Sequence, residues 1–122
     1  MKIRIRGNSV RYRLTRSEVL ELCTKGQVEE KTEFNESSFS YAVKVSDKHD
    51  DLNASFVDGG IVLHIPKTLL GDWDTNEKVG FYQNQNLDDG KELMLTLEKD
   101  FVCMDQTTED QSDNYPNPKL MK

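Results

Sequence analysis

Two segments of the chain alternate apolar and polar residues on both sides of a short turn sequence. In the first segment, residues 2–6 and 10–14 flank Gly7-Asn8; in the second, residues 52–56 and 61–65 flank Asp58-Gly59. Alternation with a period of two is typical of half-buried strands, and short Gly-containing pairs favour the tight turns of β-hairpins. The sequence therefore predicts a fold built from antiparallel hairpins.

The two turns also predict which residues face one another. With a two-residue turn at each place, apolar residues meet apolar residues on one face of both hairpins, and this agreement supports the register. The expected pairs are Lys2–Arg13, Ile3–Tyr12, Arg4–Arg11, Ile5–Val10 and Arg6–Ser9 in the first hairpin, and Leu52–Ile65, Ala54–Leu63 and Phe56–Ile61 in the second.

The rest of the chain predicts further strands and two short helices. Thr15-Arg16-Ser17-Glu18 has the form of a capping box, so a helix is expected over residues 16–24, with Gly26 after it as the stop. Pro66 suits the start of one or two helical turns over residues 66–73. Weaker or longer alternation predicts strands over residues 28–34, 39–45, 79–82 and 92–102, with a polar loop over residues 83–90.

These elements indicate an α+β domain that is mainly antiparallel β-sheet, with about seven strands and two short helices. Closure into a small barrel is one arrangement for such strands, since it removes exposed edges. No internal sequence repeat is visible. We expect a single β-rich domain over residues 1–104 and an acidic, proline-containing segment over residues 105–122 that packs on it.

The overall charge argues against several classes of function. Sixteen Lys and Arg stand against twenty-two Asp and Glu, a formal net charge of −6, whereas general nucleic-acid and membrane-surface binders are usually basic. No apolar run approaches the roughly eighteen residues of a membrane span, and no apolar signal core follows Met1. We therefore expect a cytoplasmic protein that binds neither nucleic acid nor membrane.

The positive charge is concentrated at the start of the chain. All five arginines lie within the first sixteen residues, together with Lys2 and no acid. Like charges that face one another across two strands are unfavourable by up to about 1 kcal/mol for each pair, so we expect something to neutralise them. The predicted hairpin places five bases on one face, and these are the candidate anion-binding residues Lys2, Arg4, Arg6, Arg11 and Arg13.

The end of the chain has the opposite charge. From Glu98 to Asn114 there are six acids and a single base, Lys99. Arginine has a planar fork that suits carboxylates, so the leading hypothesis is that the acidic segment folds back over the hairpin and neutralises it. The protein would then be a small non-enzymatic binding or interaction domain. The candidate acidic partners are Asp105, Glu109, Asp110 and Asp113.

Other interpretations of the two charged ends stay open. The arginine face can instead bind an external anion, such as a phosphorylated metabolite, a nucleotide or an acidic protein, with Tyr12 at its edge and the tail carboxylates as acid/base groups if the site is enzymatic. A homodimer can form if the basic head of one chain receives the acidic tail of another. The tail carboxylates can also bind a divalent cation, although they do not follow the EF-hand pattern.

No assembled catalytic motif is present. The chain has no G-x-S-x-G elbow, phosphate loop or H-E-x-x-H helix. Cys23 and Cys103 are too far apart for a redox pair, and His49 and His64 lack a Cys or His at ligand spacing. We therefore expect small buried thiols and solvated histidines, and we predict no catalytic residue, metal site or cofactor.

Several motifs at the two ends of the chain form a recognisable pattern. They are Met1 to Arg11, Leu14-Thr15-Arg16-Ser17-Glu18-Val19, Lys99-Asp100-Phe101-Val102-Cys103, Glu109-Asp110 and Asp113-Asn114-Tyr115-Pro116-Asn117-Pro118. With these motifs the chain resembles an uncharacterised family of small bacterial proteins, a domain of unknown function. The resemblance spans most of the length and implies a self-contained domain, but no mechanism and no site.

Overall fold

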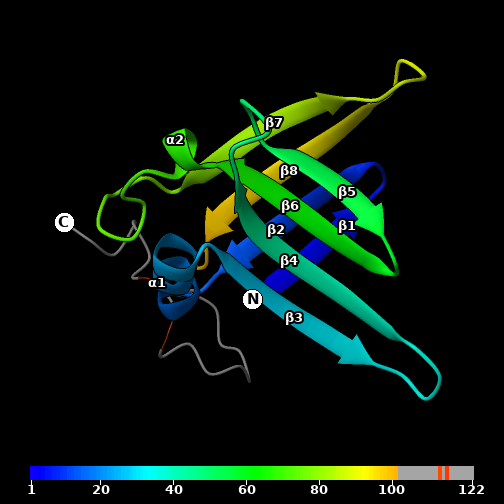
Figure 1. Cartoon of the computed structure of the whole chain (residues 1–122), viewed down its shortest axis with the longest axis horizontal. Coiled ribbons are helices and arrows are strands. Elements are labelled where there is room, and N and C mark those ends of the chain that lie inside the picture. Colours follow the sequence, from blue (N-terminus) through cyan, green and yellow to red (C-terminus); the bar gives the residue numbers. More distant parts are fainter. Residues whose placement is uncertain (102–112, 114, 116–122) are drawn as a thin grey trace.

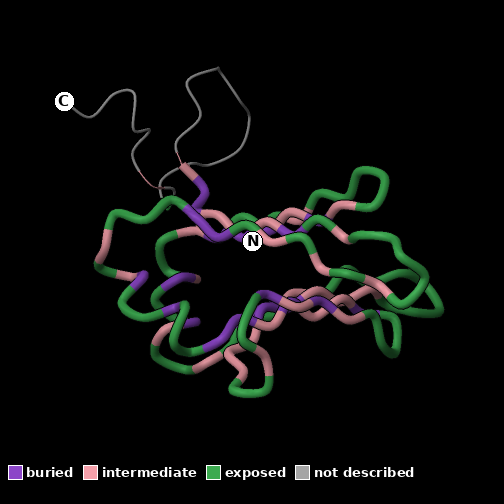
Figure 2. The backbone as a smooth tube through the Cα atoms, turned by 90° about the horizontal axis from the view of Figure 1, so that it is seen from above, coloured by how far each residue is buried: buried purple, intermediate pink, exposed green. Residues whose placement is uncertain are grey.

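The computed structural model describes residues 1–101, 113 and 115. Within these residues, eight strands form two four-stranded sheets that lie face to face, with α1 (Arg16–Lys25) and α2 (Lys67–Leu70) toward one end (Figures 1 and 2). Sheet A has the order β1 (Lys2–Arg6), β2 (Ser9–Leu14), β8 (Glu92–Lys99) and β7 (Gly80–Asn86). Sheet B has the order β3 (Gln27–Glu33), β4 (Ser38–Ser46), β6 (Gly60–Pro66) and β5 (Asn53–Val57).

Both predicted hairpins are confirmed. The β1–β2 register has all five expected pairs, including Arg4 opposite Arg11, and the β5–β6 register pairs Ala54 with Leu63 and Phe56 with Ile61. The Asp58-Gly59 turn has positive φ at both residues, 52° and 75°, as a type I′ loop requires. Local alternation and turn chemistry were therefore sufficient to predict these two hairpins.

The helix that follows β2 is also confirmed. The side chain of Thr15 accepts a hydrogen bond from the Glu18 amide, and Glu18 reaches back to the Thr15 amide, which completes the capping box. The helix ends at Gly26, whose φ of 85° is in the left-handed region that glycine adopts without strain. The second predicted helical segment forms only the short α2, after Pro66.

The predicted strand count and the barrel were wrong. The described residues have eight strands rather than about seven, and the two sheets remain separate, with β1 and β7 at the edges of sheet A and β3 and β5 at the edges of sheet B. β7 runs through residues 83–86, which had been predicted as loop because they are all polar. Their backbone pairs with β8, and the Gln85 side chain bonds both backbone groups of Ala54 in β5, so side-chain bonds rather than a backbone ladder link this pair of sheet edges.

The two halves of the chain repeat each other in connectivity. Residues 2–46 form a hairpin, a helix and a second hairpin, and residues 53–99 form the same series. In each half, the strand that precedes the helix pairs in parallel with the last strand of the other half, so that β2 pairs with β8 and β6 pairs with β4. The N-cap residues Thr15 and Pro66 are also equally far along the chain from the first residues of β2 and β6.

The core lies between the inner faces of the two sheets. Apolar side chains from β2 and β8 meet those from β4 and β6, and all of the central ones are buried. The buried Tyr12 hydroxyl donates to the Ile61 carbonyl at 3.0 Å and so links sheet A to sheet B. Among the described residues, no helix is long and apolar enough to cross a membrane.

Candidate anion-binding site

The outer face of sheet A brings the bases of the first hairpin together. Their alternation with the buried Val10, Tyr12 and Leu14 places them on the side of the sheet away from the core. β8 lies beside β2 in parallel register and adds Thr96 next to Arg11 and Glu98 next to Arg13. We call this surface the basic face; its bases are Lys2, Arg4, Arg6, Arg11 and Arg13.

Two acids, Glu98 in β8 and Asp100 just after it, neutralise the part of the basic face that lies toward α1. The Glu98 Oε1 atom is 3.3 Å from Arg11 Nε and 3.8 Å from Arg13 Nε, and Asp100 Oδ2 is 3.4 Å from Lys2 Nζ. The Tyr82 hydroxyl donates to Glu98 Oε2 at 2.9 Å and holds that carboxylate in place. Both acids belong to the acidic stretch of the sequence, but neither was among the predicted acidic partners.

A hollow of about 200 Å³ lies toward the turn of the same hairpin. Three guanidinium groups line it, and the remaining wall comes from β2 and β8. Within the described part of the chain, no carboxylate forms an ion pair with Arg4 or Arg6. Arg11 shares its partner, Glu98, with Arg13. The lining residues are Arg4, Arg6, Ser9, Val10, Arg11, Met94 and Thr96. The hollow therefore combines a concave shape with two guanidinium groups, those of Arg4 and Arg6, that form no ion pair with a carboxylate of the described residues.

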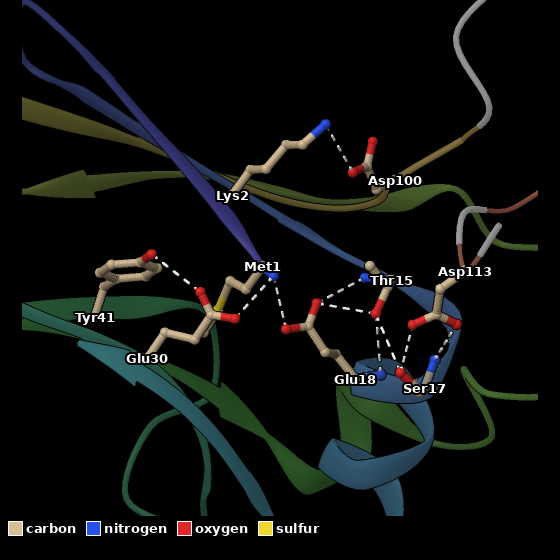
Figure 3. A network of polar contacts seen from close by, with 9 residues as sticks. All are labelled: Met1, Lys2, Thr15, Ser17, Glu18, Glu30, Tyr41, Asp100 and Asp113. Carbon is tan, nitrogen blue, oxygen red and sulfur yellow. Dashed lines mark hydrogen bonds and ion pairs between the residues drawn. The ribbon is translucent and has the colours of Figure 1, made fainter. Parts of the chain in front are cut away.

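The predicted acidic partners are only partly described. Asp105, Glu109 and Asp110 lie outside the described residues, so their place over the basic face stays a prediction. Asp113 lies at the first turn of α1, where its Oδ2 accepts from the Ser17 hydroxyl and its Oδ1 accepts from the Ser17 amide (Figure 3). The bond from the Ser17 hydroxyl lowers the pKa of Asp113 below its usual value. This carboxylate therefore caps a helix.

The α-amino group of Met1 lies in a polar network beside the same helix (Figure 3). Its nitrogen is 2.7 Å from Glu18 Oε2 and 3.2 Å from Glu30 Oε1, and the Tyr41 hydroxyl donates to the other oxygen of Glu30 at 3.0 Å. Burial acts to lower the pKa of this amine, but the hydrogen bond to Glu18 and the charges of both glutamates outweigh it, so the pKa is raised. The network joins the start of β1 to α1 and to sheet B.

Lys99 is a buried lysine. It is the single base of an acidic stretch, yet it is only 5% exposed. Its ammonium group donates to the Asn76 carbonyl at 2.7 Å and lies 5.7 Å from the ring centre of Trp73 and 5.0 Å from that of Tyr115. Burial lowers the pKa of this amine. Two aromatic rings around one cation are a structural anchor that local sequence did not indicate.

The histidines and cysteines do not join the basic face. The ring centres of His49 and His64 lie 5.7 Å apart. The pKa of His64 is lowered, mainly by burial and next by the positive charge of a protonated His49. Cys23 is half-buried with a free thiol, and burial raises its pKa, while Cys103 lies outside the described residues. In residues 1–101, 113 and 115, no three His, Cys, Asp or Glu side chains are grouped so as to hold a metal ion.

Comparison with protein-family models gives a match over residues 1–119, to a family described as "Family of unknown function (DUF7009)". Comparisons with curated proteins and with solved structures gave no match. The matched region includes the basic face, the hollow and the polar network at α1, so all three lie within the part of the chain that the family model describes. The chain therefore belongs to the DUF7009 family, whose function is unknown.

Proposed function

We propose that this protein is a small binding domain whose basic face takes an oxyanion, a phosphate or carboxylate group of a small molecule, between Arg4, Arg6 and Arg11. The observation that carries the proposal is the hollow of about 200 Å³ that these three arginines line, with Arg4 and Arg6 unpaired among the described residues. The lining offers hydrogen-bond donors and contains no His, Cys, Asp or Glu, the usual acid/base and nucleophilic residues, which favours binding over catalysis.

The chemistry of the hollow suits an oxyanion. A guanidinium group presents parallel N–H donors that match two oxygens of a phosphate or carboxylate, and the Thr96 hydroxyl adds a further donor. Arg4 and Arg11 face one another across β1 and β2, an arrangement that is unfavourable by up to about 1 kcal/mol without a counter-charge. A bound anion would supply that counter-charge, and its affinity would fall as salt screens the interaction.

The acidic segment of the chain is the second candidate occupant. Glu98 and Asp100 already neutralise the part of the basic face toward α1, which supports the idea that this protein uses its own carboxylates for that purpose. Asp105, Glu109 and Asp110 follow in sequence and can reach the hollow only if the chain turns back along sheet A. In that case the segment would compete with an external anion.

Calorimetric titration with pyrophosphate at constant low ionic strength tests the proposal. We expect the Arg4→Gln/Arg6→Gln double variant to bind about tenfold more weakly or worse, because charge-assisted bonds contribute about 1.5 kcal/mol or more. Arg13→Gln is the matched control, since Arg13 is on the same face but does not line the hollow. Equal affinities for the wild type and the double variant, or no binding by the wild type, would contradict the proposal.

A chain that ends at Met104 separates the two occupants. If the acidic segment competes for the hollow, its removal strengthens pyrophosphate binding. A lower melting temperature without ligand is expected in either case, because the removal also deletes Asp113, which bonds Ser17, and Tyr115, which lies beside Lys99. If the segment has no such role, pyrophosphate affinity stays the same. Thermal unfolding with and without ligand gives both values for each chain, because a ligand at 100 times its Kd stabilises the folded state by about 2.7 kcal/mol.

A further inference from the structure

A row of side chains on the outer face of sheet A runs from the arginines of the hollow to an exposed aromatic ring. Arg4 in β1 pairs with Arg11 in β2. Thr96 in β8 pairs with Arg11 on one side and with Tyr82 in β7 on the other. Paired residues present their side chains on the same face of a sheet, and neighbouring strands lie roughly 4.8 Å apart. Tyr82 therefore lies one strand away from Thr96, which lines the hollow, on the same face.

The ring of Tyr82 is exposed and held at its hydroxyl end. The residue is 61% exposed, and its hydroxyl donates to Glu98 Oε2 at 2.9 Å. The other oxygen of that carboxylate is 3.3 Å from Arg11 Nε, so one carboxylate bridges the ring and a guanidinium group of the hollow. No other aromatic ring or cation of the described residues stacks on Tyr82. A fixed aromatic ring with an open face is a stacking surface for a planar group.

The next row of the same face adds a thioether and an amide. Met94 in β8 pairs with Asn84 in β7, two residues along from Thr96 and Tyr82, so both side chains lie on the outer face. Met94 lines the hollow and is 56% exposed. A thioether packs favourably against a planar ring, and an amide offers both donors and an acceptor to polar atoms at the edge of such a ring. The surface beside the arginines therefore suits a polar aromatic group.

We infer that the ligand of the hollow is a nucleotide, whose phosphate lies among the arginines while its base stacks on Tyr82. The inference rests on the proposed function and adds the chemical class of the ligand. A nucleotide joins an oxyanion to a planar ring through one sugar, and the two complementary surfaces here lie on adjacent strands of one face. The formal net charge of −6 favours a small nucleotide over a nucleic-acid strand.

Four ligands separate the contributions of the phosphate and the base. Calorimetric titration at constant low ionic strength compares inorganic phosphate, ribose 5-phosphate, adenosine 5′-monophosphate and adenosine. Ribose 5-phosphate is the matched control, because it has the sugar and the phosphate of the nucleotide and lacks the base. We expect the nucleotide to bind about tenfold more tightly than ribose 5-phosphate, a gain within the range of base–aromatic stacking. Adenosine, which lacks the anion, should bind more weakly than the nucleotide.

Three variants locate the base. Tyr82→Leu should reduce the affinity for the nucleotide to about that for ribose 5-phosphate, whereas Tyr82→Phe keeps the ring and should retain most of the gain. The readout is the ratio of the two affinities, because release of Glu98 from Tyr82 affects both ligands alike. Phe34→Leu is the matched control, since Phe34 is 66% exposed, follows β3 of sheet B and does not line the hollow. It should leave the ratio unchanged.

The possible failures are distinguishable. Equal affinities for the nucleotide and ribose 5-phosphate, or an unchanged ratio in Tyr82→Leu, would overturn the inference and leave the proposed function standing. No binding of the nucleotide, ribose 5-phosphate or pyrophosphate would overturn both. Adenosine that binds as tightly as the nucleotide would show that the base is bound without the arginines, and would overturn the inference. A single-stranded oligo(dA) that binds far more tightly than the nucleotide would assign the face to a nucleic-acid strand, and would overturn it as well.

Discussion

Sheets A and B have the same connectivity but very different outer faces. When the two hairpins are aligned by their turns, the five bases of the basic face correspond to neutral or weakly basic residues of β5 and β6. Those residues are Asn53, Ser55, Val57, Val62 and His64. The same architecture therefore forms with and without the arginines, which indicates that folding does not require them.

The comparison of the sheets distinguishes the residues that the fold requires, on the inner faces, from those that it does not require, on the outer faces. Both inner faces present apolar side chains at equivalent places, such as Ile3 and Ala54, or Leu14 and Ile65. The outer faces have no such correspondence. Arg4 and Arg11 face one another across β1 and β2, which is unfavourable without a counter-charge, and sheet B has no such pair. The proposed binding function would explain this arrangement, because functional sites often reduce stability.

Replacing a central core residue of sheet A by its counterpart in sheet B should have the largest effect on the free energy of unfolding. Tyr12 in β2 corresponds to Leu63 in β6, and both are fully buried. We expect Tyr12→Leu to lower the free energy of unfolding by about 2–4 kcal/mol, because it leaves a cavity and removes the donor to the Ile61 carbonyl. Urea unfolding measures this change.

The control for this variant is Tyr82→Leu on the outer face. Tyr82 is 61% exposed and bonds Glu98 only at the surface, so its loss should cost about 0.5 kcal/mol or less. Similar losses for the two variants would mean that the interior of sheet A is not packed as described.

Making the basic face resemble sheet B should have a smaller effect of opposite sign. Arg4 corresponds to Ser55, and Arg4→Thr removes one of two like charges that face each other while keeping a residue that favours strands. We expect the free energy of unfolding to rise by about 0.5 kcal/mol, and by at most about 1 kcal/mol, at low ionic strength. Urea unfolding without ligand gives the change, and pyrophosphate binding by the same variant should weaken.

Lys31→Thr is the matched control. Lys31 lies on β3, at an edge of sheet B, and faces Ser40 rather than another base. Any gain there comes from the strand preference of threonine alone. If Arg4→Thr were no more stable than Lys31→Thr, repulsion across the basic face would not be a significant term.

The smallest expected effect is a pH dependence of the free energy of unfolding that comes from the α-amino group of Met1. The ammonium group of Met1 corresponds in position to the buried, uncharged Leu52. Since the folded pKa of the amine is raised above its ordinary value of 8.0, its contribution to stability is complete below pH 8.0 and is lost as pH rises through the folded pKa. Urea midpoints should therefore stay level up to pH 8.0 and fall above it.

Glu30→Gln should reduce this alkaline decrease, because it removes one of the two carboxylates that favour the charged amine. Glu33→Gln, at the exposed end of the same strand, should leave it unchanged. An identical decrease in the wild type and in Glu30→Gln would show that the decrease comes from other groups.

The features that were predictable from the sequence are the local ones. The two hairpins and the capped helix depend on residues close together in the chain, such as the turn at Asp58-Gly59 and the box from Thr15 to Glu18. Their signals are alternation, turn chemistry and capping, each of which is contained in about ten residues. The basic face followed from the first register alone.

The features that were not predictable depend on contacts between the two halves. The repeat is not visible in the sequence because equivalent positions, such as Tyr12 and Leu63 or Arg11 and Val62, share only the side of the sheet on which they lie. The same reason explains why Glu98 was not among the predicted acidic partners. Glu98 reaches Arg11 only through the parallel pairing of β2 with β8, which no local pattern predicts.

The parallel pairing of β2 with β8 also affects how the molecule assembles during synthesis. Sheet B occupies one uninterrupted stretch, residues 27–66, whereas sheet A must join residues 2–14 to residues 80–99. Longer loops cost more entropy to close, and non-local pairings form more slowly, so the contiguous sheet is favoured to form first. The arginine hairpin leaves the ribosome well before Glu98, because β8 follows β1 and β2 in the chain order. Until then, the hairpin carries its full positive charge.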